Sequence, residues 1–271
     1  MRFHSAVPLL FSCVFLPISA PAQQTPPQRD PRAVAILQQS LTAIGGAAAA
    51  GRVVINDVTL TGRARRIAGS DDETGTAVVK ALATGEARMD FSFPSGQHSE
   101  VRTNSEKGPA GKWSGRDGTA HTISRHNLMV DSSWFFPALM LRRLSSSQGF
   151  AVSYAGNETW DGRAVEHLTV SQQFPGVPAR AAALMQRLSQ MEIYLDASTL
   201  LPSAVSFNTH PDNDAGRDIP VEIRYSDYRV VNGAQVPFHV QKYLNNGLVL
   251  DVQFETAALN TGLSASSFST P

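Results

Sequence analysis

The chain has 271 residues, with 23 basic and 23 acidic side chains, a formal net charge of zero and 42% hydrophobic residues. No basic stripe or acidic tail interrupts this balance, which argues against a nucleic acid as a partner. The length suits one large domain or two small ones, and no repeat or low-complexity block marks a boundary between two.

The first 22 residues have the pattern of a secretory signal peptide. Arg2 supplies the charge, residues 6–20 form an apolar run, and Ala20 and Ala22 are the small residues that a signal peptidase recognises. The alternatives are a retained anchor, although a bilayer span needs roughly 20 apolar residues, and lipidation of Cys13. We predict cleavage after Ala22 and a periplasmic or secreted protein.

The rest of the chain is predicted to lack cysteine, because Cys13 is the only one. Disulfides, thiol nucleophiles and cysteine-based metal sites are then excluded. Residues 23–30 are polar and proline-rich, as in a flexible leader. Residues 31–271 are expected to form a single domain.

A helix is predicted from Pro31 to the Gly-Gly pair at 45–46, with Asp30 as its N-cap. Its apolar residues recur at spacings of three and four. The predicted face contains Val34, Leu37, Leu41 and Ile44.

Short strands and turns are predicted from residue 53 to about 124, and strands resume after residue 150. Three hairpin turns are predicted at Asp-Gly 161–162 and at the Asn-Gly pairs 232–233 and 246–247. Between them, Val236, Phe238 and Val240 alternate with polar residues. Leu248, Leu250, Val252 and Phe254 alternate on the next strand, so each strand has one apolar face.

The apolar residues of the stretch 131–144, DSSWFFPALMLRRL, go almost entirely round any helix drawn through them. Such a helix is buried on all sides or faces a second apolar partner. Proline is tolerated only in a first turn, so a short helix is predicted to begin near Pro137. The segment is either part of the core or a movable lid over a hydrophobic cavity. A further amphipathic helix is predicted to begin near Pro178.

Helices inserted into a run of strands indicate an α+β fold. Eight to ten strands are expected to form one strongly curved antiparallel sheet, a half-open barrel with three helices closing over its concave face. Whether the interior is filled by side chains or partly empty is left open by these patterns.

Three stretches of the chain resemble a known superfamily. They are a strand ending in D-x-x-T-x-L-P (residues 196–202), DYRVVNGAQVP (residues 227–237) and the terminal LNTGLSASSFSTP, with Asn260, Phe268 and Pro271. These stretches resemble the bacterial outer-membrane lipoprotein carriers (LolA-like) and the related LppX-type lipid-binding proteins. Members form a half-open barrel whose helices close over an apolar cavity for acyl chains of lipids or lipoproteins. The carriers' lid-contacting arginine has three candidates here, Arg63, Arg65 and Arg66.

The resemblance implies a carrier or binding protein for a lipid or acylated lipoprotein, without a cofactor, that exchanges cargo with a membrane-associated donor or acceptor protein. Two sets of residues are predicted to contact the ligand. The lid set contains Trp134, Phe135, Phe136, Leu139 and Met140. The sheet-wall set contains Val236, Phe238, Val240, Leu248, Leu250, Val252 and Phe254.

Two other functions remain as alternatives: a periplasmic sensor or protein-binding scaffold with a filled core, and an unrecognised hydrolase. No G-x-S-x-G, S-x-x-K or phosphate-binding loop is present. The spacing of His121 and His126 fits no common zinc pattern, and residues 210–218 lack the glycine and glutamate of a calcium loop. We therefore predict no catalytic residues and no metal site, unless Ser, His and a carboxylate converge in a pocket.

Overall fold

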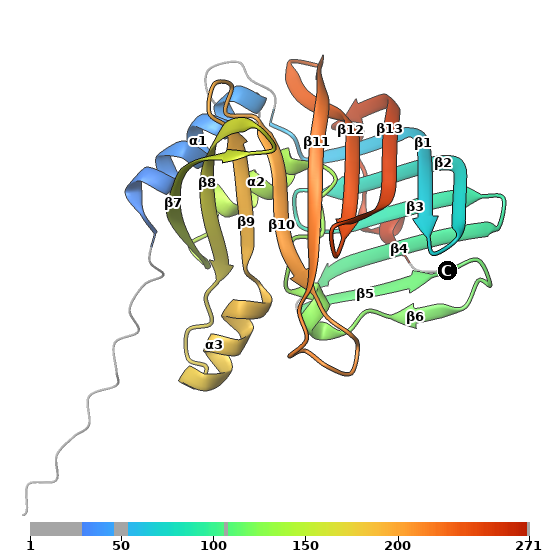
Figure 1. Ribbon diagram of the computed structural model, residues 1–271, viewed down its shortest axis with the longest axis horizontal. Helices are drawn as coiled ribbons and strands as arrows, with labels where there is room; N and C mark the ends of the chain where they lie inside the picture. Colours follow the sequence, from blue (N-terminus) through green and yellow to red (C-terminus); the bar gives the residue numbers. More distant parts are fainter. Residues whose placement is uncertain (1–28, 46–53, 106–107, 270–271) are drawn as a thin grey trace, which may run out of the picture.

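The computed structural model describes residues 29–45, 54–105 and 108–269 (Figure 1). The predicted signal peptide and most of the leader lie outside these residues. The helices are α1 (Pro31–Ile44), α2 (Pro137–Ser146) and α3 (Ala179–Leu188), with the 3-10 helices η1 (Arg125–Leu128) and η2 (Ala265–Phe268). The strands are β1 (Asp57–Ala68), β2 (Asp71–Leu82), β3 (Ala87–Phe93), β4 (Gly96–Ser105), β5 (Gly108–Ser114), β6 (Ala120–Thr122), β7 (Phe150–Trp160), β8 (Arg163–Gln172), β9 (Met191–Asp196), β10 (Pro202–Thr209), β11 (Ile219–Val231), β12 (Ala234–Leu244) and β13 (Gly247–Leu259).

In the described residues thirteen strands form one sheet, in the order β6-β5-β4-β3-β2-β1-β13-β12-β11-β10-β9-β8-β7. Each named strand pairs antiparallel with its neighbours. The strands β1 to β6 form one meander and β7 to β13 form a second. The two meanders are joined where β1 pairs with β13, for example at Val58 and Leu259. The two edges, β6 and β7, therefore come from the middle of the chain. The predicted α+β class and curved antiparallel sheet are confirmed, with more strands than the eight to ten expected.

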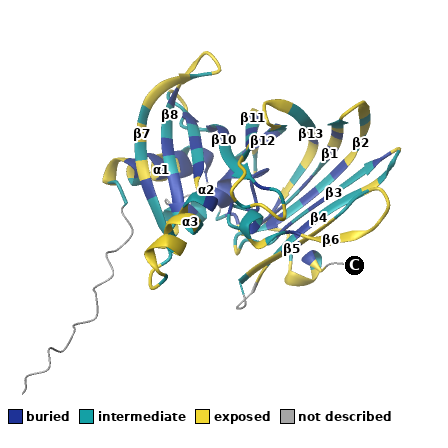
Figure 2. Ribbon diagram, turned by 60° about the horizontal axis from the view of Figure 1, so that its bottom comes forward, coloured by how far each residue is buried: buried dark blue, intermediate teal, exposed yellow. Residues whose placement is uncertain are grey.

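The sheet curls into an open trough, and α1 and α2 lie in it against strands β7 to β13 (Figures 1 and 2). Bulges at the pairs β1–β13, β12–β13, β7–β8 and β9–β10 add local twist to the curl. Buried apolar residues from both helices and from the concave face form one core. The half-open barrel is thus filled by helices over one part of its length.

Helix α1 begins and ends as its sequence predicts. Asp30 accepts a hydrogen bond from the backbone N–H of Arg32 at 2.8 Å, and Gly45 ends the helix with φ of 89°. The buried face is rotated slightly from the predicted one, because Ile36 is buried and Val34 is only half-buried. Two residues of the predicted leader also contact the fold, since Arg29 and Asp30 lie along β7.

Helix α2 begins at Pro137, as predicted, and is buried on nearly all sides. Helix α1 packs on one side of it and the sheet lies on the other. The aromatic residues before it are fixed by polar contacts: the Tyr225 hydroxyl donates to the Trp134 carbonyl at 2.6 Å, and Ser132 Oγ donates to the Gly85 carbonyl at 2.6 Å. This segment is an inner layer of the core.

Helix α3 lies mainly in solvent. Its apolar residues Ala181 and Leu184 are exposed, and of its residues only Leu188 is buried. The helix contacts β8 and η1 at its base. Among the described residues, no helix combines the length and the apolar character needed to cross a bilayer.

Two hairpin turns follow the prediction and one does not. The Asp161–Gly162 and Asn232–Gly233 pairs have positive φ at both residues and connect adjacent strands. The third turn is formed by Asn245 and Asn246, with φ of 49° and 64°, and Leu244 pairs with Gly247. The predicted Asn246–Gly247 turn is wrong by one residue, because asparagine also tolerates the left-handed conformation.

The predicted apolar face of β13 is also corrected. A bulge places Leu250 opposite Lys242 but Leu248 opposite Tyr243, which is the next residue on β12. Successive residues point to opposite faces of a sheet. Leu248 therefore lies on the convex face, whereas Leu250, Val252 and Phe254 keep the concave face.

Candidate functional site

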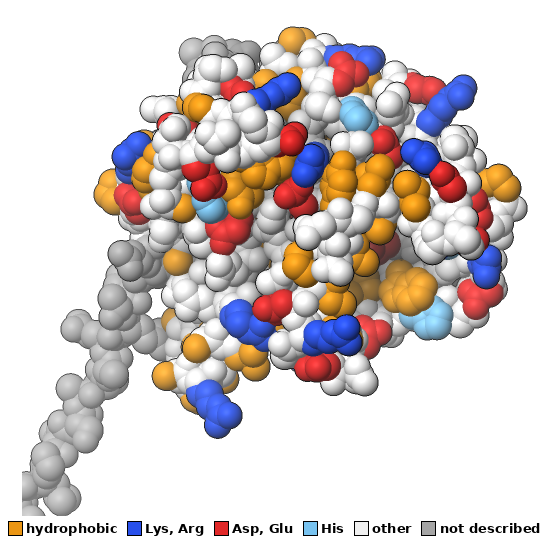
Figure 3. Space-filling view, in the orientation of Figure 1, with side chains coloured by type: hydrophobic (Ala, Val, Ile, Leu, Met, Phe, Trp, Pro, Cys, Tyr) orange, Lys and Arg blue, Asp and Glu red, His pale blue; other side chains and the backbone are white. Residues whose placement is uncertain are grey.

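A cleft occupies the part of the trough that α1 and α2 do not fill. It consists of two adjoining cavities of about 570 Å³ and about 240 Å³ that share Lys242, Leu244 and Val249. In Figure 3 apolar side chains gather around a hollow between the β12–β13 hairpin and strands β4 to β6. We call these two cavities together the concave cleft.

Two walls of the concave cleft are apolar. Phe91 and Phe93 on β3 and Trp113 on β5 form one wall, with the two phenylalanine ring centroids 6.1 Å apart. Val249 and Leu250 at the β13 bulge form the facing wall. Trp113 is 42% exposed and stacks on His121, with ring centroids 4.4 Å apart. The mouth therefore exposes a large apolar surface, a feature of binding grooves.

Charged side chains lie inside this apolar cleft. Arg102 Nε donates to Glu100 Oε1 at 2.7 Å, and the Lys242 ammonium nitrogen lies 5.0 Å from the centroid of the Trp134 ring. Burial lowers the pKa of Lys242, and the positive charge of Arg102 lowers it further, against an opposing effect of Glu100. Burial raises the pKa of Glu100, but attraction to Arg102 and Lys242 outweighs this effect, so its pKa is lowered.

His98 is a further titratable side chain of this wall. Burial lowers the pKa of His98, and the nearby positive charge of Arg66 lowers it further. Its Nε2 is buried and has no hydrogen-bond partner within the parts of the chain that the structure describes. A lowered pKa favours the neutral imidazole.

The concave cleft is bridged at its inner end by η1. Asn127 donates to the His210 carbonyl at 2.8 Å and accepts from the His210 N–H at 2.9 Å. His126 Nε2 lies 3.1 Å from the Pro211 carbonyl oxygen. These contacts join the loop after β6 to the loop between β10 and β11 and span the open side of the trough.

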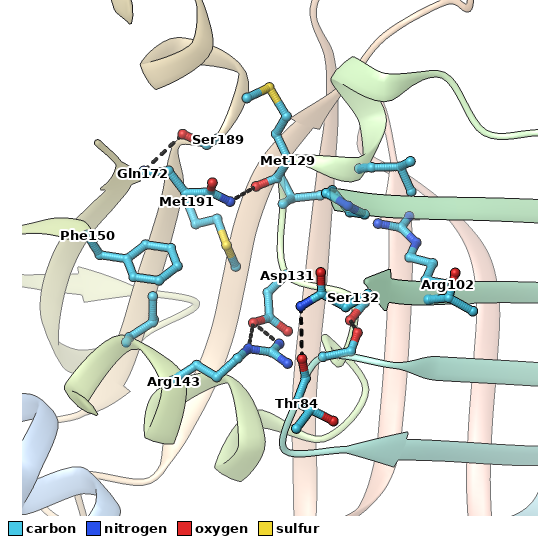
Figure 4. A pocket seen from close by; sticks show the side chains of 17 residues that line it. Thr84, Arg102, Met129, Asp131, Ser132, Arg143, Phe150, Gln172, Ser189 and Met191 are labelled. Carbon is cyan, nitrogen blue, oxygen red and sulfur yellow. Dashed lines mark hydrogen bonds and ion pairs between the residues drawn. The ribbon is translucent and has the colours of Figure 1, made fainter. Parts of the chain in front are cut away.

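A separate side cavity of about 240 Å³ adjoins the cleft at Arg102 and Val130 (Figure 4). Its lining is rich in polar groups that already bind one another. Asp131 and Arg143 form an ion pair, with Nε 3.0 Å from Oδ2, and Gln172 Nε2 donates to the Met129 carbonyl at 2.7 Å. The side cavity has less than half the volume of the main cavity of the cleft, so it is the poorer site for an acyl chain.

The predicted lid residues lie in the core beside the cleft. None of the five exposes more than 4% of its surface, and Trp134 is the one that lines the cleft. Of the predicted wall residues, Leu250 lines the cleft, and Leu248 lies on the convex face. The other five, Val236, Phe238, Val240, Val252 and Phe254, are buried in the core. The assignment of both sets to a ligand remains a prediction.

The three candidate arginines on β1 occupy different positions. Arg63 and Arg65 lie on the convex face, where they form ion pairs with Glu255 and Asp72. Arg66 lines the concave cleft.

Sequence reasoning missed Lys242, although a signal for it was present. The predicted apolar face of β12 contains Val236, Phe238 and Val240, and a period of two places residue 242 on that face. A lysine at an apolar position requires an explanation, because lysine is almost never fully buried without a partner. The alternation along β4 also places Glu100 and Arg102 on one face of the strand. The sequence does not indicate which face of β4 is concave, so their position in the cleft could not be predicted.

Ser, His and a carboxylate do meet, but on the convex face. His239 Nδ1 lies 2.9 Å from Ser226 Oγ, and His239 Nε2 lies 2.8 Å from Asp251 Oδ1. None of the cavities described above includes them. The flanking backbone groups are engaged in the β11–β12–β13 ladders. An oxyanion requires preorganised free donors, so this trio does not support hydrolysis.

The two histidine-containing motifs have other contacts. His121 stacks on Trp113, and His210 Nε2 lies 2.9 Å from Asp218 Oδ1. In the described ranges, no group of three or more His, Cys, Asp or Glu side chains is arranged to hold a metal ion.

Comparisons with known proteins give a match in structure but none in sequence. No family model and no curated protein matches the chain. A LolA superfamily protein from Nitrosomonas europaea has a TM-score of 0.53 at 13% identity, covering 88% of this chain and 97% of that chain. A DUF1329 family protein from Desulfovibrio piger has a TM-score of 0.54 at 13% identity, with the same coverage.

A domain named for outer membrane lipoprotein sorting, from Vibrio parahaemolyticus, has a TM-score of 0.53 at 12% identity. The match covers 88% of this chain and 96% of the Vibrio chain. Identities this low carry information about the fold alone. The open curved sheet with helices in its trough, together with these matches, shows that the chain has the LolA-like fold.

Proposed function

We propose that the protein binds a lipid or the acyl chain of a lipoprotein in the concave cleft, as an exported carrier or binding protein. The observation that carries this proposal is the aromatic-walled cavity of about 570 Å³ on the concave face. Small-molecule sites are mostly apolar clefts of about 300–1,000 Å³ with a few polar groups that fix orientation. The cleft has both features, with Phe91, Phe93 and Trp113 on one wall and Glu100 and Lys242 inside.

The driving force is the transfer of methylene groups from water into the cleft. Each buried CH₂ contributes about 0.8 kcal/mol, so a chain of ten buried methylenes contributes about 8 kcal/mol before the cost of ordering. The two cavities adjoin at Lys242, Leu244 and Val249, and in this proposal one chain extends from the larger cavity into the smaller one.

In this proposal the ligand enters through the open mouth, without movement of α2. The aromatic segment before α2 is held by Tyr225, Ser132 and the Asp131–Arg143 pair, and its side chains are buried. The predicted lid residues would contact a ligand only after these contacts break, with Trp134 as the exception.

The proposal includes export and exchange of cargo. A signal peptide cleaved after Ala22 would deliver the protein to the periplasm or the medium. The name of the Vibrio protein refers to lipoprotein sorting, and a transfer role for this chain would require a membrane-associated donor or acceptor protein. Transfer of a ligand between such partners requires that the mouth of the cleft is open to solvent. The exposed ring of Trp113 lies at this mouth.

The test compares two tryptophans that each stack on a neighbouring ring, Trp113, which is exposed, and Trp160, which is half-buried. Trp113 lies at the mouth, whereas Trp160 lies on the sheet away from the cleft, with its ring centroid 5.8 Å from that of Tyr194. Trp113→Ala is expected to weaken binding of a C16–C18 amphiphile by about tenfold, because part of the apolar wall is lost. Trp160→Ala is expected to leave the affinity unchanged. Titration with a brominated acyl chain, read by quenching of tryptophan fluorescence, measures both.

Native mass spectrometry of the exported protein gives a second readout. A mass increment that disappears after delipidation, and whose extract contains acyl lipids, supports the proposal. A mass equal to that of the chain alone, together with no quenching in either variant, contradicts it.

The alternative of a protein-binding scaffold is supported by a different observation. Helix α3 exposes Leu184 to 47% and has an apolar side without a covering element in the described residues. If the protein shows no lipid binding, a protein partner at α3 is the next function to test.

A further inference from the structure

Two cations and one leucine form a row across three adjacent strands of the concave cleft. Lys242 on β12 and Arg66 on β1 both pair with Leu250 on β13, so all three side chains lie on the same face. All three line the larger cavity. Paired residues on neighbouring strands are about 5 Å apart, which places Lys242 and Arg66 about 10 Å apart at their Cα atoms. Their long side chains can reach a common ligand above Leu250.

Neither cation is held in an ion pair by the described part of the protein, although Glu100 attracts Lys242 through space. Among the described residues, the Lys242 ammonium and the Arg66 guanidinium form no hydrogen bond and no ion pair. Glu100 is engaged by Arg102 at 2.7 Å. Glu73, opposite Arg66 on β2, accepts a hydrogen bond from Ser95 at 2.6 Å and forms no ion pair with Arg66.

The lining of the concave cleft therefore has an excess of positive charge. Arg66, Arg102 and Lys242 face it, with Glu100 as the one carboxylate among its lining residues. His98 adds no positive charge at neutral pH, because its pKa is lowered. A half-buried ammonium without an acceptor is costly in an apolar site. An anion bound there would relieve this cost by forming charge-assisted hydrogen bonds.

We propose that the concave cleft selects a single-chain amphiphile with an anionic head group, bound above Leu250 between Lys242 and Arg66. The acyl chain lies along Phe91, Phe93 and Trp113. This inference rests on the proposed lipid-binding function and adds the chemistry of the head group. Carboxylate and phosphate share this chemistry, so a fatty acid and a lysophospholipid are the two sources to compare.

The experiment measures affinities for oleate, oleyl alcohol and 1-oleoyl-lysophosphatidate by isothermal titration calorimetry, below their aggregation concentrations. The first two ligands have the same chain and differ in the charge of the head group. The wild-type protein is expected to bind oleate or lysophosphatidate about tenfold more tightly than the alcohol. The tighter of the two anions identifies the head group as carboxylate or phosphate.

Three variants assign the selectivity to residues. Lys242→Met and Arg66→Met are expected to weaken binding of the preferred anion by about tenfold, while affinity for the alcohol stays within about twofold. Lys112→Met is the matched control, because Lys112 is exposed on β5 and lines neither cavity of the cleft. Retained binding of the alcohol shows that each variant is folded.

The outcomes separate this inference from the function on which it rests. Equal affinity of the wild-type protein for anions and alcohol overturns the inference and leaves lipid binding intact. Binding of none of the three ligands overturns the proposed function itself. If Lys242→Met fails to fold, the salt dependence of wild-type binding replaces this variant. Affinity for the anion is expected to fall with ionic strength, whereas affinity for the alcohol is not. An equal response of both ligands to salt contradicts the inference.

Discussion

Asp131 and Arg143 form a polar anchor next to the aromatic segment. Asp131 is 7% exposed and also accepts hydrogen bonds from the N–H and the hydroxyl of Ser133 at 2.8 Å and 2.7 Å. Arg143 Nη1 has no partner among the described residues. The Asp131 carboxylate thus accepts several hydrogen bonds, whereas the Arg143 guanidinium has one nitrogen without an acceptor in the described chain. Removal of the carboxylate would leave this guanidinium poorly paired.

Asp131→Ala is expected to lower the free energy of unfolding by about 3 kcal/mol, because it leaves a buried charge and a turn without their partners. Asp72→Ala is the matched control. Asp72 pairs with Arg65 at 2.6 Å, but both side chains are 50% exposed, and solvent screens such surface pairs so that they contribute little to stability. Urea denaturation measures both variants, and similar losses in the two would show that burial does not control the effect.

Lys242 gives a second prediction at the residue scale. Without ligand, Lys242→Met is expected to raise the free energy of unfolding at pH 7 by about 1 kcal/mol, because it removes a half-buried charge that has no hydrogen bond and no ion pair with the described residues. The pKa of Lys242 is lowered in the folded protein, so the unfolded chain binds more protons between the folded and the ordinary pKa. Wild-type stability therefore rises with pH across that window.

The advantage of Lys242→Met should be largest below the lowered pKa of Lys242 and should shrink as the pH approaches the ordinary value of 10.5. Urea denaturation of both proteins at pH 7 and pH 10 measures the two differences. A variant less stable than the wild type at both values would indicate that Lys242 has a stabilising partner.

The position of Lys242 on the concave face follows from the period-two pattern of β12, but its lack of an ion-pair partner does not. Glu100 and Arg102 come from β4, and which strands of the two meanders face each other across the trough is a property of the folded sheet. A single sequence gives alternation along a strand and no information on pairing across a cavity.

At the scale of elements, the helices and hairpins follow local chemistry. Asp30, Pro31 and Gly45 set the limits of α1, and Pro137 sets the start of α2. The bulge on β13 could not be predicted, because it requires Val249 as an extra residue opposite Lys242, and no local signal marks it. One unrecognised bulge reversed the predicted face of Leu248.

Gly62 at the β1–β13 bulge supports the curl of the sheet. A Cβ atom there would lie 2.1 Å from the Gln253 carbonyl oxygen and 2.6 Å from Phe254 Cα, both of which are backbone atoms. Gly62→Ala is therefore expected to lower the free energy of unfolding by about 2–3 kcal/mol. Gly247→Ala is the control, because its nearest neighbour would be at an ordinary 3.5 Å, and it should change stability by less than about 1 kcal/mol.

Chemical denaturation distinguishes the two glycines. If Gly62→Ala is as stable as Gly247→Ala, the strands can separate at the bulge without cost, and the curl does not depend on that close approach.

At the scale of the molecule, the sequence was sufficient for the fold class and insufficient for the location of the cleft. An apolar excess such as residues 131–144 is equally compatible with a lid and with a core layer. The choice depends on the space between α1 and the sheet, which α2 fills with Leu139, Met140 and Leu141. The cleft instead lies between the β12–β13 hairpin and strands β3 to β5.

Hydrogen exchange can test this division of the interior. Addition of an amphiphile is expected to slow amide exchange at the ends of β3, β5, β12 and β13 that border the cleft, and to leave α2 unchanged, because α2 is already buried without ligand. Exchange in α2 that accelerates on ligand addition would instead identify the helix as a lid that opens.

The seam between β1 and β13 has a consequence for synthesis. It joins distant parts of the chain: Asp57 and Thr261, which are bonded at 2.7 Å, are 204 residues apart in sequence. Folding slows as contacts become less local, and here the middle of the sheet needs both its earliest and its latest strand. A growing polypeptide can form the first meander early, but it cannot join the two meanders until β13 has emerged.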